Sequence, residues 1–212
     1  MVRFHNTKVY GLEESIVASG YSFRSAPRVE PGREAVAKDW DRAKRLGSAD
    51  PGMGHDGWLK GVVVQADVVY PQYWTKQAQR YHWFDYIMST SNMHMLVKNA
   101  SLPLEEFKKQ FNSYVDEDLI VRIQEYAEKF NNCTDPEERY QLFMKLQSNL
   151  PMGFELITRV TTNYLQLKTM YLQRRTHRLK EDWGAFALWC DSLPHFNELT
   201  GIPKFEMPAL KM

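Results

Sequence analysis

The stretch LKGVVVQADVVYPQYWTKQAQRYHWFDYIMSTSNMHML, residues 59–96, joins the most strand-like run of the chain to a polar segment rich in aromatic residues. β-Branched residues dominate 59–70, which predicts a strand. Pro71 then stands where a helix can begin, because the first helical residue needs no backbone donor. We therefore expect a helix from Pro71 to about Met88, an end or break near 89–92, and a ligand site along 71–96.

The rest of the chain predicts helices around a small sheet. A short strand is expected over 2–10, and helices over 11–20, 34–46, a stretch opening at Ser101 and Pro103, 116–130, 134–149 and 154–190. Loops are expected over 25–33 and 47–57, where proline and glycine accumulate. The fold class predicted is helix-rich α+β, as a single domain over 1–212. Its proline-rich tail, from about 191, is expected on the surface or on a neighbouring subunit.

One helix start is specific in sequence. Thr134-Asp-Pro-Glu137 has the pattern of a capping box with proline in the first turn. This pattern predicts that Thr134 caps a helix that runs to about Asn149.

Composition restricts the classes of function. The chain has 212 residues, 43% of them hydrophobic, which is enough for a real core. Its 27 basic and 26 acidic residues nearly balance, so no overall field attracts nucleic acid or a membrane surface. No segment approaches the ~20 apolar residues of a spanning helix. Only Cys133 and Cys190 are present, without metal-ligand spacing, so we expect no metal site, no disulfide framework and a cytoplasmic location.

Arg174 is the first candidate for binding an anion. It lies on or beside the apolar stripe expected for the 154–190 helix, and a buried guanidinium needs an acceptor. The spacing of Asn163, Leu167, Met170 and Arg174 places them on one helix face over about 16 Å. The alternative is a solvated basic face on which Arg174 pairs with a surface carboxylate.

Gln77 and Arg80 are the second candidates. They are one helical turn apart, and an amide beside a guanidinium can bind a pyrimidine edge and a phosphate. They can equally form a hydrogen-bonded pair on an exposed helix.

The order of these features resembles the flavin-dependent thymidylate synthases. The similar positions are Ala18–Phe23, Gly54-His55-Asp56 before the strand, Pro71, Gln77 and Arg80 on the following helix, Leu150-Pro151, Thr161-x-Asn163 and Arg174. The signature of that family departs after Arg80. Tyr81 and His82 replace His-Arg, Asp85 replaces a serine, Ile87 and Met88 replace Asn-Glu, and Asn92 and Met93 replace the final Arg-Tyr.

The resemblance implies a chemistry in which the protein supplies no covalent nucleophile. FAD would be the cofactor, with NADPH and methylenetetrahydrofolate as co-substrates. A methyl or hydroxymethyl group would be transferred to C5 of a pyrimidine nucleotide such as dUMP. Family members form homotetramers with shared active sites, so a monomer is expected to have an incomplete pocket.

The resemblance also implies residue roles. Arg174 would polarise the pyrimidine as the catalytic residue. Substrate binding would involve Gln77, Arg80, Thr90, Ser91 and Arg174, and cofactor binding would involve His55, Arg80, His82, Asn163 and Arg178.

Two alternatives remain open at this stage. The chain can be a catalytically lapsed relative that binds nucleotides or nucleic acid. It can also be an unrelated helical protein whose basic patch over 174–180 binds polyanions, although the balanced charge argues against nucleic acid as a partner.

Overall fold

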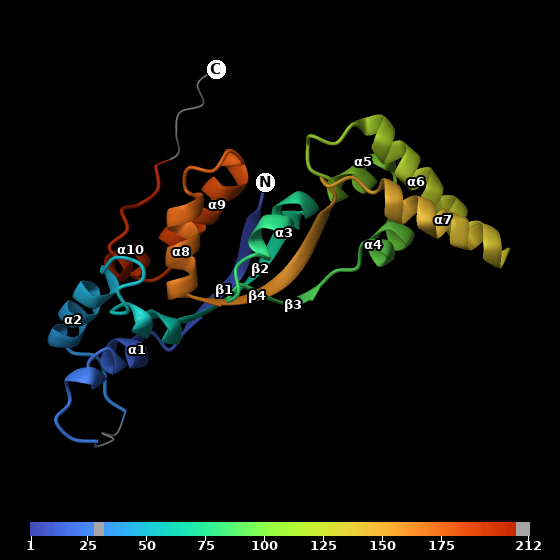
Figure 1. The fold of residues 1–212 in the computed structure, drawn as a ribbon. Helices are drawn as coiled ribbons and strands as arrows, with labels where there is room; N and C mark the ends of the chain where they lie inside the picture. Colours follow the sequence, from blue (N-terminus) through green and yellow to red (C-terminus); the bar gives the residue numbers. More distant parts are fainter. Residues whose placement is uncertain (28–31, 207–212) are drawn as a thin grey trace.

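The computed structural model describes residues 1–27 and 32–206 of the chain. The molecule is elongated, with a twisted sheet in the middle, a group of helices around α1, α2 and α10 at one end and a helical arm at the other (Figure 1). The strands are antiparallel in the order β1-β2-β4-β3: β1 Arg3–Tyr10, β2 Val63–Pro71, β3 Asp85–Ser89 and β4 Glu155–Asn163. The predicted helix-rich α+β class is confirmed.

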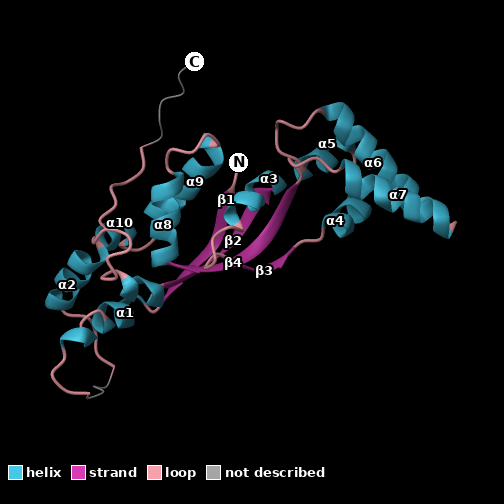
Figure 2. Cartoon of the chain, viewed as in Figure 1, coloured by secondary structure: helices cyan, strands magenta, loops and turns pink. Residues whose placement is uncertain are grey.

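The helices fall into three groups, shown in Figure 2. Those that pack on the sheet are α3 (Gln72–Ala78), α8 (Tyr164–Arg174) and α9 (Lys180–Asp191). Those at the α2 end are α1 (Leu12–Ala18), α2 (Ala37–Gly47) and α10 (Phe196–Thr200). Those of the arm are α4 (Asn92–Asn99), α5 (Leu104–Phe107), α6 (Glu117–Asn132) and α7 (Pro136–Asn149). Short 3-10 turns cover Tyr21–Phe23, Gly57–Gly61 and Lys108–Gln110.

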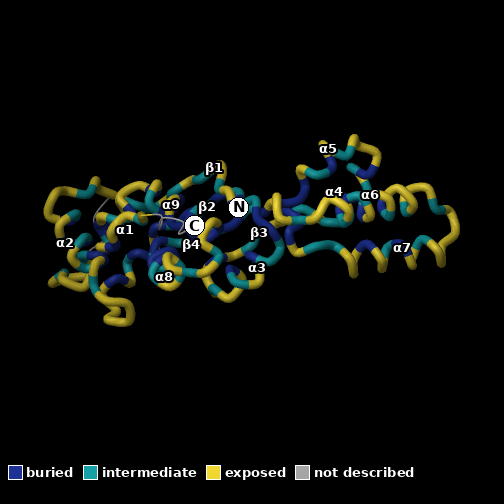
Figure 3. Tube along the Cα trace, turned by 90° about the horizontal axis from the view of Figure 1, so that it is seen from above, coloured by how far each residue is buried: buried dark blue, intermediate teal, exposed yellow. Residues whose placement is uncertain are grey.

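The central strand β2 explains why one face of the sheet is covered. Val64, Ala66 and Val68 alternate with half-exposed residues and are completely buried against α3, α8 and α9. On the other face Asp67 accepts a hydrogen bond from Arg159 of β4 at 2.9 Å. The period of two therefore separates a fully buried face from a partly exposed one (Figure 3).

The arm has its own small core. Phe107, Ile123, Leu146 and Phe154 are buried in a cluster separate from the one on the sheet. Helices α6 and α7 pack against each other and turn their outer faces to solvent. The arm therefore depends on its own helix–helix contacts as well as on the sheet.

The predicted helix over 154–190 was wrong in its first part and too long. Residues 155–163 form strand β4, which pairs with β2 on one side and β3 on the other. Leu156, Val160 and Tyr164 are spaced by four, which fits a helix face and also one face of a strand. Pairing across the sheet decides between the two, and a turn between Arg174 and Lys180 separates α8 from α9.

The predicted helix over 71–88 was also wrong beyond its first turns. Helix α3 ends at Ala78, and residues 85–89 form the edge strand β3. Pro71 is the last residue of β2 and precedes the helix, with an extended backbone (ψ 148°). The expected break at 89–92 is instead where α4 begins, at Asn92.

The tail was predicted to lie on the surface or on a neighbouring subunit, and for its first part this was wrong. Phe196, Leu199 and Ile202 are buried in the main core, and 196–200 forms α10. Residues 207–212 of the tail and 28–31 of the predicted 25–33 loop lie outside the described residues. The strand over 2–10 and the helices over 11–20, 34–46 and 116–130 are confirmed within a few residues.

The N-cap of α7 allows a direct test of the helix start. Asp135, and not the predicted Thr134, caps the helix, because its carboxylate accepts a hydrogen bond from the Glu138 N–H at 2.7 Å. Asp135→Ala is therefore expected to lower the free energy of unfolding by about 1 kcal/mol in urea denaturation. Thr134→Ala is the matched control and should change it little; equal losses for both variants would contradict this assignment.

Across residues 1–27 and 32–206, no helix is long and apolar enough to cross a membrane, and no cluster of three or more His, Cys, Asp or Glu side chains has metal-binding geometry.

Candidate functional site

Arg174 lies at the end of α8 and meets two aromatic side chains. Its Nε donates a hydrogen bond to the hydroxyl of Tyr81 at 2.7 Å. The guanidinium carbon lies 5.3 Å from the Tyr81 ring centre and 5.0 Å from that of Trp183. The side chain is half-buried, and among the described residues it has no carboxylate partner. The positive charge of Arg174 is therefore held in place without being neutralised.

Trp183, on α9, links Arg174 to helix α3. Its ring is 1% exposed, and its Nε1 donates a hydrogen bond to Oε1 of Gln77 at 3.1 Å. The alternative, in which Gln77 pairs with Arg80 on an exposed helix, is not what the structure has. Gln77 is half-buried against Trp183, while Arg80 is exposed in the turn that follows α3. Gln77 therefore contacts the edge of the indole ring that Arg174 lies over.

A second hydrogen bond fixes Tyr81. Its hydroxyl donates to Oε1 of Gln173 at 2.9 Å, and Gln173 directly precedes Arg174 on α8. Tyr81 itself follows the end of α3, where its N–H bonds to the carbonyl oxygen of Ala78. The turn after α3 therefore docks onto the end of α8 through one phenol.

A small cavity of about 130 Å³ adjoins this group. It is lined by residues of the α8–α9 turn, with Trp183 and Phe205. His177 lies in the lining with its ring 6.1 Å from that of Trp183. Partial burial, and then the charges of Arg174 and Arg178, lower the pKa of His177, so its neutral form is favoured near neutral pH.

Asn163 lies at the opposite end of α8 from Arg174. Its side-chain oxygen accepts a hydrogen bond from the Gln166 N–H at 2.9 Å and caps the helix. The predicted shared face is present from this cap to the last turn, with Leu167 and Met170 buried between. The polar ends of that face are separated by the length of α8.

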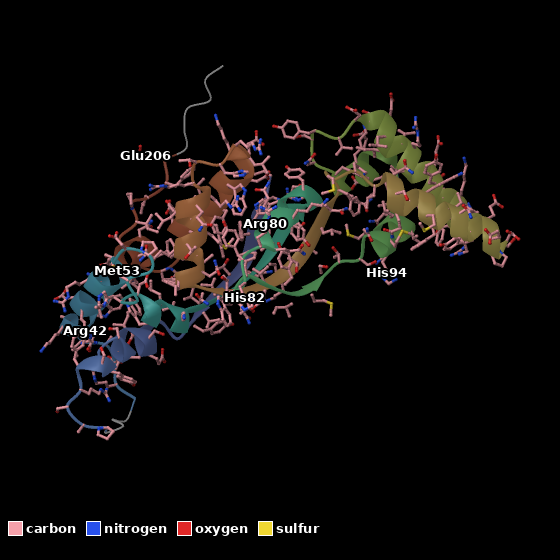
Figure 4. The ribbon with its side chains drawn as sticks, viewed as in Figure 1. Arg42, Met53, Arg80, His82, His94 and Glu206 are labelled. Carbon is pink, nitrogen blue, oxygen red and sulfur yellow. The ribbon has the colours of Figure 1, made fainter. Side chains whose placement is uncertain are left out.

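His55 is held by a loop at the α2 end of the molecule. Figure 4 shows Met53, in the same loop, beside that end and away from Arg80, which lies over the centre. His55 is exposed, whereas the next residue, Asp56, is buried and pairs with Lys168 at 2.8 Å. Within one chain the structure does not bring His55 to Arg80.

Thr90 and Ser91 form structural hydrogen bonds near the arm. The Thr90 hydroxyl accepts from the Ile157 N–H at 3.1 Å, and Ser91 caps α4. His82 is exposed and touches Trp83 edge-on. Among the described residues, no hydrogen bond joins Thr90, Ser91 or His82 to Arg174.

A larger cleft of about 610 Å³ lies between α9 and the start of α6, and exposed Arg178 is in its wall. Inside it the Tyr73 hydroxyl donates to Asp182 at 2.9 Å. Burial, followed by this carboxylate, raises the pKa of Tyr73, so the phenol stays protonated.

Sequence patterns missed three residues of these groups: Tyr81, Trp183 and Lys168. Trp183 and Lys168 belong to no motif in the sequence, so no local pattern indicates them. Tyr81 had one indication, since it interrupts the family signature directly after Arg80.

The chain has the fold of the flavin-dependent thymidylate synthases. One similar structure is thymidylate synthase X (ThyX) from Helicobacter pylori with FAD and dUMP, at a TM-score of 0.69 and 14% identity, covering 97% of this chain and 98% of that one. A second ThyX structure from that organism, complexed with FAD and dUMP, has a TM-score of 0.66 at 14% identity, covering 96% of this chain and 98% of that one.

A UMP/dUMP methylase, PolB from Streptomyces cacaoi bound with 5-Br dUMP, is also similar. Its TM-score is 0.54 at 12% identity, covering 98% of this chain and 97% of that one. No family model and no curated protein matches the sequence. The likeness therefore establishes the fold, which the sequence resemblance had predicted.

Proposed function

We propose that this chain is a flavin-dependent enzyme that transfers a one-carbon unit to C5 of a pyrimidine nucleotide such as dUMP. The observation that carries the proposal is Arg174, a guanidinium fixed between Tyr81 and Trp183 with no carboxylate partner in the described chain. Supporting it, proteins with this fold have been crystallised with FAD and dUMP.

The residues around Arg174 fit a planar, electron-rich ligand. The ring of half-buried Tyr81 offers aromatic surface, whereas Trp183 is buried and only supports the guanidinium. The nitrogens of Arg174 that do not bond Tyr81 can donate to a ring carbonyl. Donation to that carbonyl stabilises negative charge on its oxygen, and a base with this enolate character is the form in which C5 is nucleophilic. FAD, when bound, supplies the redox chemistry, and NADPH and methylenetetrahydrofolate are the proposed reductant and one-carbon source.

The phosphate must be held differently from the family pattern. Asn92, the first residue of α4, has no charge to offer in place of the family's arginine. Arg80 is exposed beside Tyr81, and we propose that it contacts the nucleotide phosphate and the cofactor.

A site shared between copies follows from the same placement. The remaining proposed ligand contacts are Gln77, His55, His82, Thr90, Ser91, Asn163 and Arg178. Because the loop of His55 and the start of α4 lie apart from Arg80 in one chain, we propose that a homotetramer completes each site.

Titration with FAD tests this function. The purified protein should show a flavin absorption band, or gain bound FAD that co-elutes in gel filtration, and dUMP should then perturb that band. Turnover should yield a dUMP derivative substituted at C5. Protein that takes up no FAD contradicts the proposal, and uptake of FAD and dUMP without product indicates the lapsed relative instead.

A further inference from the structure

We propose that Tyr81 is a positioning residue that sets which edge of the Arg174 guanidinium a ligand meets. This inference rests on the proposed function, because it assigns the nucleotide to Arg174. Tyr81 stands where the related family has histidine, so the device belongs to this chain.

The hydrogen bond to Tyr81 removes one of the two binding edges of Arg174. A guanidinium can present two parallel N–H donors either from its side, through Nε and one Nη, or from its end, through both Nη atoms. The phenol oxygen of Tyr81 is a single acceptor and occupies Nε at 2.7 Å. The end-on edge is therefore the one left for a ligand.

Gln173 sets the direction of this hydrogen bond. The Tyr81 hydroxyl has one proton, and it donates that proton to Oε1 of Gln173 at 2.9 Å. The oxygen lone pairs are then available to the Nε–H of Arg174, as the second hydrogen bond requires. Because Gln173 and Arg174 are neighbours on α8, the phenol bridges two consecutive side chains.

A phenol is uncharged, whereas a carboxylate is negatively charged, and this difference affects the charge that Arg174 can offer to a ligand. An aspartate or glutamate at this position would orient Arg174 equally well but would neutralise its charge. Tyr81 orients the guanidinium and leaves the charge for the ligand, while Trp183 covers it at 5.0 Å. The ligand group that matches is a ring carbonyl, because the two lone pairs of its oxygen can accept from both Nη atoms, and a uracil provides such a carbonyl.

Tyr81→Phe isolates the hydroxyl, because it keeps the aromatic ring. In FAD-loaded protein we expect it to reduce dUMP binding or turnover at least tenfold, the scale of one hydrogen bond to a charged group. FAD affinity and the unfolding midpoint should remain those of the wild type. Gln173→Met should shift the same parameter by a smaller factor, and Tyr140→Phe, on the exposed side of α7, should shift nothing.

A readout that needs no turnover separates the two proposals. In protein labelled with 15N-arginine, the Nε–H of Arg174 should exchange slowly with water, its signal being identified by its loss in Arg174→Lys. Tyr81→Phe should make this exchange fast. If Tyr81→Phe keeps the slow exchange and the dUMP affinity of the unmodified protein, the role of Tyr81 is overturned. If the unmodified protein binds neither FAD nor dUMP, the proposed function is overturned, and the exchange data still test Tyr81.

Discussion

Replacing Lys168 with methionine is expected to lower the free energy of unfolding by about 3–5 kcal/mol. Lys168 is only 3% exposed, and its ammonium has three acceptors at hydrogen-bonding distance. These are the Asp56 carboxylate at 2.8 Å and the carbonyl oxygens of Gly47 and Ala49 at 2.9 and 2.7 Å. Methionine fills similar space but leaves the buried Asp56 carboxylate without its partner.

Denaturation in urea at neutral pH measures this effect. Lys180→Met is the matched control, because Lys180 is exposed, and it should change the free energy of unfolding by less than about 0.5 kcal/mol. Adding Asp56→Asn to Lys168→Met removes the unpaired charge and should recover part of the loss. A loss below about 1 kcal/mol in the single variant would show that water reaches Asp56.

The same ion pair ties α8 to the loop that carries His55. Lys168 is in the middle of α8, and its acceptors are at the end of α2 and in the loop that follows. Ala49 and Asp56 therefore hold the loop in place, while His55 stays exposed. Loss of the pair is expected to loosen the loop as well as to destabilise the fold.

Replacing Arg174 with alanine is expected to reduce turnover of the FAD-loaded enzyme by roughly 100-fold or more. The proposed reaction develops negative charge on the pyrimidine carbonyl. Arg174, held beside Tyr81 and Trp183, is the cation that stabilises this charge. The side chain is half-buried at the last turn of α8 and makes no ion pair within the described chain. Folding should therefore change much less than activity.

Steady-state rates at saturating FAD, together with gel filtration and thermal unfolding, test this expectation. Arg122→Ala on the exposed side of α6 is the control and should leave rate and assembly unchanged. Loss of assembly or folding in Arg174→Ala, with parallel loss of activity, would assign Arg174 a structural role. Normal turnover in Arg174→Ala would remove it from the mechanism.

Part of the fold could be predicted from local sequence because the signals act over a few residues. The β-branched run before Pro71 forms β2, and the periodic apolar residues of 116–130 form α6. The proline after Asp135 marks the start of α7, although the capping residue is Asp135 and not the predicted Thr134. The resemblance to the flavin-dependent thymidylate synthases likewise used short motifs, and the fold agrees with it.

The strands β3 and β4 could not be predicted in this way. Residues 155–163 have helical spacing and strand spacing at once, and only pairing with β2 favours the strand. The segment 85–89 pairs at the sheet edge with β4, where the hydroxyl of Thr158 donates to the carbonyl of Met88, 70 residues away. Pairing between segments so far apart in the chain cannot be predicted from a short stretch of sequence.

The sequence by itself determined that this chain is a helix-rich α+β protein, and it pointed to Arg174 and Gln77 as polar residues on packed helices. The tertiary structure decided their partners. Tyr81 reaches Arg174 across 93 positions of sequence, and Asp56 reaches Lys168 across 112. Such hydrogen bonds depend on distances of about 3 Å between distant segments, which only the packing of α3, α8 and the loop after α2 can set.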